Sequence, residues 1–501
     1  MYTHRLWLLG CLVLGGSLMP ALVRADVIVA YEVVPPEAEG GDIDILARLL
    51  KADGTLGWEA ETPTVLASSA HAETSPVVVA DGEGGAFVIY ELTFTEGEHK
   101  GDMDLVAQHI GADGTLLWND GEQPVGVATS TGRESHPVAL GDGAGGFIVA
   151  YEWQGEDGDV DVLAQRMSAE GESRWATDDA PALVGVSPGR ERNPVLVPDG
   201  AGGVLVLFEW EGPDGTTDVM AQRVTAEGRA AWNNGEQAVD VSASPSNERA
   251  VTAVADGAGG ALVAFELEFL EGEFKGDVDV MGQRITGDGV VVWNGGEQPS
   301  LLASGKGIER HPQAIGDGAG GMMVLFEYEP LEGEFAGDID IMAQRVDSNG
   351  RLLWHDGEQS AAVSAAGGLE RAPQLVPLSD GSAIAVLEHE FRNGENAGDI
   401  DVVGQRLSRE GQLLWNGGEQ STMLSGAKWL ERTPVALADG EGGAIVVLTA
   451  VGPEGEFEGD EDVWALRVSQ EGQLLWHNGE QSVEIAGSDL LERRPGAAVV
   501  Q

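Results

Sequence analysis

The segment Glu309–Glu358 decides the fold, because it holds the repeating unit of this chain in its clearest form. In order it contains E-R-H-P (309–312), an apolar run, D-G-A-G-G (317–321), M-M-V-L-F-E (322–327), an acidic loop, G-D-I-D-I-M-A-Q-R-V (337–346), a polar turn and R-L-L-W-H-D-G-E-Q (351–359). Similar segments fill most of the chain, and each has a tryptophan at the same position: Trp58, Trp118, Trp175, Trp232, Trp293, Trp354, Trp415 and Trp476. Eight copies spaced 57–61 residues apart indicate a repeat protein.

The composition limits the partners that this chain can bind. Its 501 residues include 84 Asp and Glu against 28 Lys and Arg, a formal net charge of −56. Such a surface repels nucleic acids and anionic lipids, whose binding needs clustered Lys and Arg. Hydrophobic residues make up 42% of the chain, in patterned runs, whereas disordered chains of high charge contain few of them. The sequence therefore predicts a folded protein that does not bind nucleic acid.

The first 25 residues have the composition of a secretory signal. Arg5 precedes the mostly apolar run 6–22, and the small-residue site 23–25 predicts cleavage before Asp26. We therefore expect a secreted or periplasmic protein in which residues 26–501 form one domain, as a monomer. Cys11 is the only cysteine and leaves with the signal, so no disulfide is expected. No later apolar run approaches the ~20 residues of a membrane helix.

Each repeat contains four short apolar runs separated by turn residues, a pattern that predicts four antiparallel strands. In the repeat after residue 134 we expect strands at Pro137–Leu140, at Phe147–Glu152 and at Asp159–Met167, with a fourth strand ending near Trp175. The glycines of the turn 141–146 supply the positive φ angles that tight turns need. Nearly continuous apolar residues in the second and third runs indicate sheets that are covered on both faces.

Four-stranded sheets of this kind, repeated eight times, predict an all-β fold, an eight-bladed β-propeller. The two ends of the chain support closure of the ring. The mature chain starts with a second strand, D-V-I-V-A-Y-E (26–32), and ends with a first strand, R-P-G-A-A-V-V-Q (494–501). We therefore expect the C-terminal strand to complete the N-terminal blade. An open solenoid would need atypical polar caps, and neither end has the composition of one.

The segments Asp338–Trp354 and Pro137–Trp153 resemble repeats of exported bacterial β-propeller proteins. The resemblance covers nearly the whole mature chain and implies the same fold and export. Most members of that family are uncharacterised, so the resemblance implies no particular activity.

The strongest candidate for chemistry is a recurring cluster of carboxylates. Asp-x-Asp opens the predicted third strand in seven repeats: Asp42/Asp44, Asp102/Asp104, Asp159/Asp161, Asp277/Asp279, Asp338/Asp340, Asp399/Asp401 and Asp460/Asp462. The second strand ends in Glu32, Glu91, Glu152, Glu209, Glu266, Glu327 and Glu388, and Thr449 breaks the series. The first strand begins near Glu73, Glu134, Glu191, Glu248, Glu309, Glu370, Glu431 and Glu492. In an up-and-down blade these ends share one rim, so three or four acids per blade should converge there.

Two interpretations of this acidic rim compete. Calcium prefers about six to eight oxygen ligands, which makes the following residues candidate ligands: Asp102, Asp104, Asp159, Asp161, Asp277, Asp279, Asp338, Asp340, Asp399, Asp401, Glu91, Glu152, Glu266 and Glu327. Alternatively the acids cap loops or pair with arginines, either those after the first-strand glutamate (Arg192, Arg249, Arg310, Arg371, Arg432, Arg493) or those on the third strand (Arg166, Arg223, Arg284, Arg345, Arg406, Arg467). The sequence favours pairing and capping, because the spaced twelve-residue calcium loop is absent.

The tryptophans divide into two groups. One in every repeat favours a packing role between blades. Trp153 and Trp210 instead follow the second-strand glutamate in single repeats, and this position makes them candidate ligand-binding residues at the rim. Phe274, Phe335 and Phe457 lie in long rim loops, where we expect them to anchor the loop.

The sequence favours a non-enzymatic binding scaffold with an acidic rim, whose partner is an unknown protein or carbohydrate. No G-x-S-x-G motif, histidine pair with metal-ligand spacing or single unusual repeat marks a catalytic centre. Two alternatives stay open. One is a glycan-active hydrolase or lyase, suggested by Trp153 and Trp210 beside carboxylates. The other is a calcium-stabilised structural protein of the envelope or matrix.

Overall fold

The computed structural model describes residues 25–500 except 35–41, 60–61, 156–157, 176–180, 186, 243, 306, 420, 427, 453–458, 477–481 and 489. The predicted signal segment therefore lies outside the described residues up to position 24, and so does Phe457.

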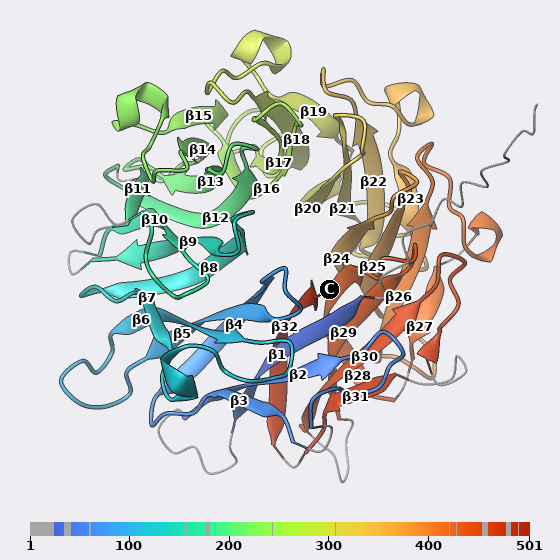
Figure 1. Ribbon diagram of the computed structural model, residues 1–501. Coiled ribbons are helices and arrows are strands. Elements are labelled where there is room, and N and C mark those ends of the chain that lie inside the picture. The colour runs from blue at the N-terminus through green and yellow to red at the C-terminus, as the bar shows by residue number, and fades with distance from the viewer. Residues whose placement is uncertain are drawn as a thin grey trace, which may run out of the picture.

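The described chain is built from β-strands, four to each sequence repeat (Figure 1). The first strands lie nearest the centre: β4 (Ala72–Ala80), β8 (Arg133–Gly141), β12 (Arg190–Pro198), β16 (Asn247–Ala255), β20 (Gly307–Gly316), β24 (Leu369–Pro377), β28 (Leu430–Ala438) and β32 (Leu491–Val500). The second strands are β1 (Asp26–Val34), β5 (Ala86–Thr93), β9 (Phe147–Gln154), β13 (Val204–Glu211), β17 (Ala261–Glu268), β21 (Met322–Pro330), β25 (Ala383–Glu390) and β29 (Ala444–Val451).

The third strands are β2 (Asp44–Leu50), β6 (Met103–Ile110), β10 (Val160–Met167), β14 (Thr217–Val224), β18 (Val278–Ile285), β22 (Asp340–Val346), β26 (Ile400–Leu407) and β30 (Glu461–Val468). The outer strands are β3 (Thr64–Ala67), β7 (Val125–Ala128), β11 (Ala182–Gly185), β15 (Val239–Ser242), β19 (Ser300–Ala303), β23 (Ala361–Ser364), β27 (Thr422–Ser425) and β31 (Val483–Ala486). Short 3₁₀ turns begin at or directly after several repeat tryptophans: η1 (Asn119–Gly121), η2 (Trp232–Gly235), η3 (Trp293–Gly296), η4 (His355–Gly357) and η5 (Asn416–Gly418).

We number the repeats in chain order, so that repeat 1 contains β1–β3, repeat 2 contains β4–β7, and repeat 8 contains β28–β31. Within a repeat, neighbouring strands pair antiparallel. Repeat 1 takes its first strand from the other end of the chain, because β32 pairs with β1 from Asp26 opposite Val500 to Val34 opposite Leu491. Single parallel bridges such as Met103–Arg133 link some neighbouring sheets. The two ends of the chain therefore share one four-stranded sheet.

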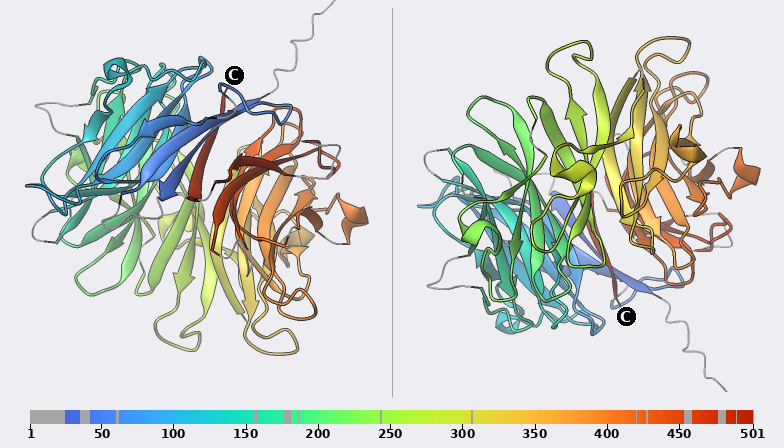
Figure 2. Two further views of the ribbon diagram at one scale, coloured as in Figure 1. Left: turned by 90° about the horizontal axis from the view of Figure 1, so that it is seen from below. Right: turned by 90° about the horizontal axis from the view of Figure 1, so that it is seen from above.

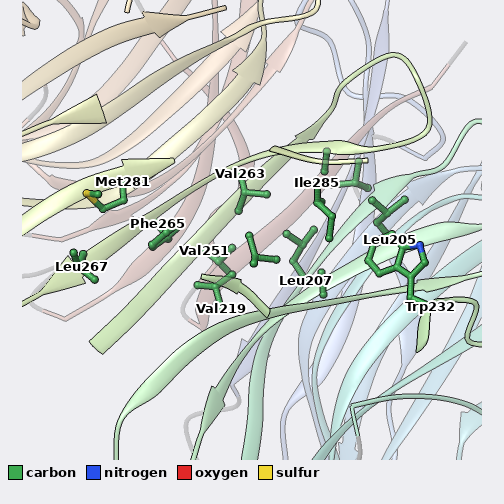
Figure 3. Close-up of a cluster of buried hydrophobic side chains, with 14 residues drawn as sticks. Leu205, Leu207, Val219, Trp232, Val251, Val263, Phe265, Leu267, Met281 and Ile285 are labelled. Carbon is green, nitrogen blue, oxygen red and sulfur yellow. The ribbon is translucent and has the colours of Figure 1, made fainter. Parts of the chain in front are cut away.

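The hydrophobic core lies between neighbouring sheets, not within one central cluster. Figure 3 shows the cluster between repeats 4 and 5, where Leu205, Leu207 and Trp232 pack against Val263 and Ile285. Similar clusters occur at the other junctions, and one joins β29–β31 of repeat 8 to β1 of repeat 1. Both faces of the second strands, such as β5 and β9, are buried in this way, which explains their continuous apolar sequences.

The all-β prediction and the four-stranded antiparallel sheets are confirmed, and the sheets stand around a common axis in a β-propeller-like arrangement (Figures 1 and 2). The predicted fourth strand was wrong. The L-L-W segment before Trp118 makes only an isolated bridge, Ile110–Leu116, and the true outer strand β7 follows the tryptophan turn. Among the described residues, no helix is long and apolar enough to span a membrane.

Candidate functional site

The two ends of the sheets carry different chemistry. We call the end with the D-G-x-G-G turns the clamp end, and the end where second strands finish and third strands begin the acidic rim. At the clamp end Asp317 accepts two backbone N–H groups of its own turn through Oδ1. Its Oδ2 pairs with Arg345 of β22 at 2.7 Å. Arg345 and the indole of Trp354 both donate to the carbonyl of Arg409 in the next repeat, at 3.1 and 2.9 Å.

This Asp–Arg–Trp clamp recurs along the chain. Equivalent pairs are Asp142–Arg166, Asp199–Arg223, Asp256–Arg284 and Asp439–Arg467, with His109–Asp81 in repeat 2 and Arg406–Asp380 in repeat 7. The expectation that third-strand arginines neutralise the acidic rim is therefore wrong. Arg166 lies five residues after Asp161, about 16 Å along the strand, so it reaches the opposite end of the sheet.

Ionisation of the clamp aspartate Asp317 is favoured in spite of its burial. Burial opposes the charge of Asp317, but its hydrogen bonds from Ala319, Arg345 and Gly321 outweigh this cost and lower its pKa. A buried, paired carboxylate of this kind adds stability only while it is charged.

The repeat tryptophans belong to the same clamps. Each indole N–H donates to a turn carbonyl of the following repeat, and the series ends with Trp476 donating to Ala52 of repeat 1. Trp118 and every later member are at least 95% buried. The packing role predicted for these tryptophans is confirmed.

At the rim, the second-strand glutamates bridge repeats. Glu266 accepts Nε of Arg249 through Oε2 at 3.1 Å and the backbone N–H of His311, in the next repeat, through Oε1 at 2.7 Å. His311 has φ 51°, an uncommon angle for a residue other than glycine. Glu91, Glu152, Glu209, Glu327 and Glu388 make the same contact with the next repeat. The predicted pairing of the glutamate with the first-strand arginine holds for Arg249, Arg310 and Arg493.

The other rim acids form one row across each sheet. In repeat 3, Glu134 of β8 lies opposite Trp153 of β9, and Trp153 lies opposite Asp161 of β10. Residues directly opposite each other project from the same face, with Cβ atoms about 4.5–5.5 Å apart. Every repeat keeps the glutamate and the aspartate, and only the central residue changes: Val33, Leu92, Trp153, Trp210, Leu267, Tyr328, His389 and Ala450.

Burial makes several of the outer acids of these rows hard to ionise. It raises the pKa of Glu134, which is 1% exposed, to about 7, and the nearby charges of Asp104 and Asp102 add to the effect. The pKa is raised in the same way to about 7 at Glu73 and about 8 at Glu191, Glu248 and Glu309. Burial and neighbouring carboxylates also raise the pKa to about 6 at Asp104, Asp279, Asp340 and Asp401. Because so many repeats share these shifts, a raised pKa does not single out one catalytic repeat.

The candidate calcium ligands fall into groups with different contacts and positions. Glu91, Glu152, Glu266 and Glu327 bind the next repeat. Asp102 accepts the N–H of Gly132, and Asp338 pairs with Arg392; Asp159, Asp277 and Asp399 precede β10, β18 and β26. Asp104, Asp161, Asp279, Asp340 and Asp401 occupy the cross-strand rows. Within the described part of the chain, no group of three or more acidic, histidine or cysteine side chains is placed to hold a metal ion.

The size of the central residue of the row varies together with the residue that stands two positions before the first-strand glutamate. Where the central residue is aromatic, that position is glycine: Gly132 with Trp153, Gly189 with Trp210, Gly307 with Tyr328, and Gly368 with His389. A Cβ at any of these four glycines would lie 2.5–2.8 Å from the partner ring. In the other repeats the position holds His71, Ser246, Trp429 or Leu490, and the central residue is Leu92, Leu267, Ala450 or Val33, respectively. One edge of each aromatic ring is therefore used for packing.

A groove of about 620 Å³ opens beside Trp153, between repeats 2 and 3. Trp153 is half-buried and lines the groove with Glu134 and Asp161. A second row, Tyr151 opposite Leu163 and Leu163 opposite Leu183, continues the same face. The facing wall is formed by 127–130 of repeat 2, and Ser130, Thr129, Gln165 and Ser173 add polar groups to the lining. The structure thus brings predicted residues Trp153 and Asp161 into one groove, while Trp210 occupies the same place in repeat 4.

The long rim loops extend into solvent. Phe274 is 60% exposed but lies against Phe269, with ring centroids 5.9 Å apart. This contact agrees with the anchoring role predicted for Phe274. Phe335 is similarly exposed.

Sequence reasoning missed the contribution of Glu134, Tyr151 and Leu163 to the groove. It also missed the paired change of central residue and glycine. The aligned repeats contain that signal, because the glycine appears in the four repeats that have an aromatic or imidazole ring. The groove itself could not be found this way, since it depends on how the edge of one repeat lies against its neighbour.

Comparison with known proteins yields no family. No protein-family model matches the chain, and no curated protein matches its sequence. Among solved structures, an ulvan lyase of a polysaccharide lyase family is 11% identical, covering 81% of this chain and 95% of its own, with a TM-score of 0.45. The polysaccharide lyase Uly1 is 10% identical over 78% of this chain and 90% of its own, also with a TM-score of 0.45. A protein of unknown function from Dyadobacter fermentans is 11% identical over 79% and 94%, with a TM-score of 0.37. Likenesses at this level assign no function.

Proposed function

We propose that this protein is an exported, non-enzymatic binding scaffold: an eight-bladed β-propeller, closed by β32, that binds a carbohydrate in the groove beside Trp153. The observation that carries this proposal is the groove itself, where a residue peculiar to a few repeats lines a cavity large enough for a small ligand. Pairing of β32 with β1 and the core between repeats 8 and 1 support closure.

The repeated acids support a scaffold more than an active centre. Their carboxylates cap the next repeat or share rows that recur in every repeat. A residue needed by all repeats serves the architecture, whereas recognition requires a feature that distinguishes one position from the others. A tryptophan at this row position occurs only in repeats 3 and 4, and the half-buried indole of Trp153 can offer an apolar surface while its edge rests on Gly132.

The lining favours a sugar that carries no acidic group. The indole of Trp153 and the side chains of Tyr151, Leu163 and Leu183 provide apolar surface for the C–H face of a pyranose ring. Carboxyl, amide and hydroxyl groups nearby can accept or donate hydrogen bonds to sugar hydroxyls. The net charge of −56 repels uronates and sulfated glycans.

Binding of neutral and acidic oligosaccharides to the full mature chain, followed by isothermal titration calorimetry, tests this proposal. Trp153→Ala should abolish binding of a neutral oligosaccharide, whereas Leu267→Ala, the same row position in repeat 5, should leave it unchanged. Equal loss in both variants, or binding by neither the parent nor the variants across a broad neutral panel, would disprove a site at Trp153.

A second function, glycan hydrolysis or elimination, is favoured by one observation. Glu134, with its pKa raised to about 7 by burial, lies in the groove and could serve as a proton donor at neutral pH. Turnover of a polysaccharide panel that Glu134→Gln abolishes, but that Glu309→Gln in repeat 6 preserves, would establish an enzyme. Binding without turnover would leave the scaffold as the function.

Calcium and export are further parts of the proposal. If rim carboxylates bind calcium, the melting temperature should rise in millimolar calcium beyond the rise in an equal ionic strength of sodium chloride.

If residues 1–25 act as a signal, the secreted chain should begin at Asp26 when it is analysed by mass spectrometry.

A further inference from the structure

A second site is indicated by the one break in the ring of bridging glutamates. In seven repeats the second strand carries a glutamate whose Oε1 accepts an N–H of the next repeat. In repeats 1, 5 and 6 its Oε2 also pairs with the first-strand arginine. At Glu327, Oε2 accepts Nε of Arg310 at 3.1 Å and Oε1 accepts the N–H of Ala372 in the next repeat at 3.3 Å. Glu32 repeats this arrangement with Arg493 at 3.1 Å and with the N–H of Ser75 at 2.9 Å.

Repeat 8 has Thr449 at this position. Thr449 lies directly opposite Arg432, as Glu327 lies opposite Arg310, so the backbone register is unchanged. The threonine side chain is shorter and uncharged, and its hydroxyl lies 3.3 Å from the hydroxyl of Thr433. Arg432 is exposed, and within the described residues it forms no salt bridge. The arginine is therefore kept while its carboxylate is absent.

The donor on the other side of the junction is also kept. Arg494 is the residue of repeat 1 that corresponds to Ala372 and Ser75, and it has the same left-handed conformation, with φ 48°. In the other repeats this conformation accompanies an N–H that a glutamate of the preceding repeat accepts. Repeat 8 offers only Thr449 to Arg494. The guanidinium of Arg432 and the N–H of Arg494 are thus two donors at a position where other repeats have a glutamate. The side chain of Thr449 is too short to bind both of them.

We propose that a carboxylate group of a ligand binds at this junction of repeats 8 and 1, with one oxygen toward Arg432 and the other toward the N–H of Arg494. The ligand group would replace the glutamate side chain that the other seven repeats supply from within the chain. Arginine suits this role because its guanidinium pairs with carboxylates in a fixed geometry. The carboxylate could belong to a small free acid or to a larger molecule.

The local charge permits such a ligand in a chain that is acidic as a whole. Arg493 and Arg494 lie beside Glu32, and Arg432 acts electrostatically on Glu388. Glu32 pairs with both Arg493 and Arg494, and Glu388 accepts the N–H of Thr433. Both glutamates are therefore occupied by contacts within the chain. The far field of the other acids weakens with ionic strength, so moderate salt should favour specific carboxylate binding over general repulsion.

The test is a thermal melt of the full mature chain in sodium acetate and in sodium chloride of equal ionic strength. The parent protein should show a saturable rise in melting temperature in acetate alone. Thr449→Glu restores the missing side chain, so it should raise the melting temperature without acetate and remove the acetate response. Glu388→Thr creates a similar arrangement, with the N–H of Thr433 and Arg371, which also pairs with Glu390, as donors. It should lower the melting temperature and enlarge the acetate response.

Two results would overturn the proposal. One is an equal acetate effect in the parent and in Thr449→Glu. The other is no acetate effect in either the parent or Glu388→Thr. If acetate acts, a short oligouronate and a free dicarboxylate, each titrated against the parent and Thr449→Glu, show which source binds more tightly. The groove beside Trp153 takes no part in these measurements, so they do not depend on the proposed carbohydrate site.

Discussion

The clamp end and the acidic rim of each sheet are made by the same strands, yet they vary in different ways. At the clamp end, aspartate, arginine and tryptophan recur almost without change, and each set touches the next repeat. At the rim the flanking acids recur, but the residue between them ranges from Ala450 to Trp153. The comparison separates what joins repeats from what can differ between them. Substitutions at the clamp end and at the rim, compared for their effects on stability, test this distinction.

Loss of a clamp tryptophan should have the largest effect on stability. Trp293 is 2% exposed and donates to the carbonyl of Ser348 in the next repeat. Trp293→Ala removes this contact and leaves a cavity between sheets, at a cost of about 3–5 kcal/mol in the free energy of unfolding. Trp153→Ala, at the rim, should cost clearly less because Trp153 is half-buried. Chemical denaturation of both variants measures the difference, and similar costs would show that the two ends are equally structural.

Breaking a clamp ion pair should have the next largest effect. Arg345→Met leaves the nearly buried carboxylate of Asp317 without its cation, which costs about 3 kcal/mol. The matched control is Arg174→Met, whose partners Glu170 and Glu172 are exposed and whose pairs should contribute at most about 1 kcal/mol. If Arg345→Met costs no more stability than Arg174→Met, the Asp317–Arg345 ion pair does not help to join the repeats.

The two ends should also respond to pH in opposite directions. At the rim, Glu309 has its pKa raised to about 8, so the stability associated with its protonated form is present below its ordinary pKa and is lost as the pH rises toward 8. At the clamp end, the lowered pKa of Asp317 means that its contribution is present above the ordinary value and is lost as the pH falls below it. The melting temperature should therefore peak near pH 5 and decline toward pH 8.5.

A variant of Glu309 measures how much this one residue contributes to the loss of stability with rising pH. Glu309→Gln keeps the shape of the buried side chain without its charge, so the variant should lose less stability than the parent between pH 5 and 8.5, by at least about 1 kcal/mol. Glu271→Gln, in an exposed loop, should follow the parent curve. A stability that rises steadily from pH 5 to pH 8.5 would contradict buried, protonated acids at the rim.

The sequence was sufficient to predict the sheets because the strands obey a local rule: a strand covered on both faces is continuously apolar, as in Phe147–Tyr151. The same rule misplaced the outer strand. The L-L-W segment makes only an isolated bridge through Leu116, and its Trp118 reaches the neighbouring repeat. The partner of Arg166 was also misplaced, since charge suggests attraction to any acid, whereas strand length selects Asp142 at the other end. Contacts between repeats decided each of these cases, and sequence order does not give their geometry.

The smallest effect expected here tests whether the rim can vary as freely as the repeats suggest. Leu267→Trp gives repeat 5 the central residue of repeats 3 and 4, but Ser246 stands where those repeats have glycine. We expect the single substitution to cost about 1–2 kcal/mol through crowding. Adding Ser246→Gly should recover most of this loss, although glycine at the same position in the parent would bring no gain. A double-mutant cycle gives the coupling energy between the two positions. A coupling near zero would mean that the glycines beside Trp153 and Trp210 serve the loop alone, and that ring and glycine do not vary as one unit.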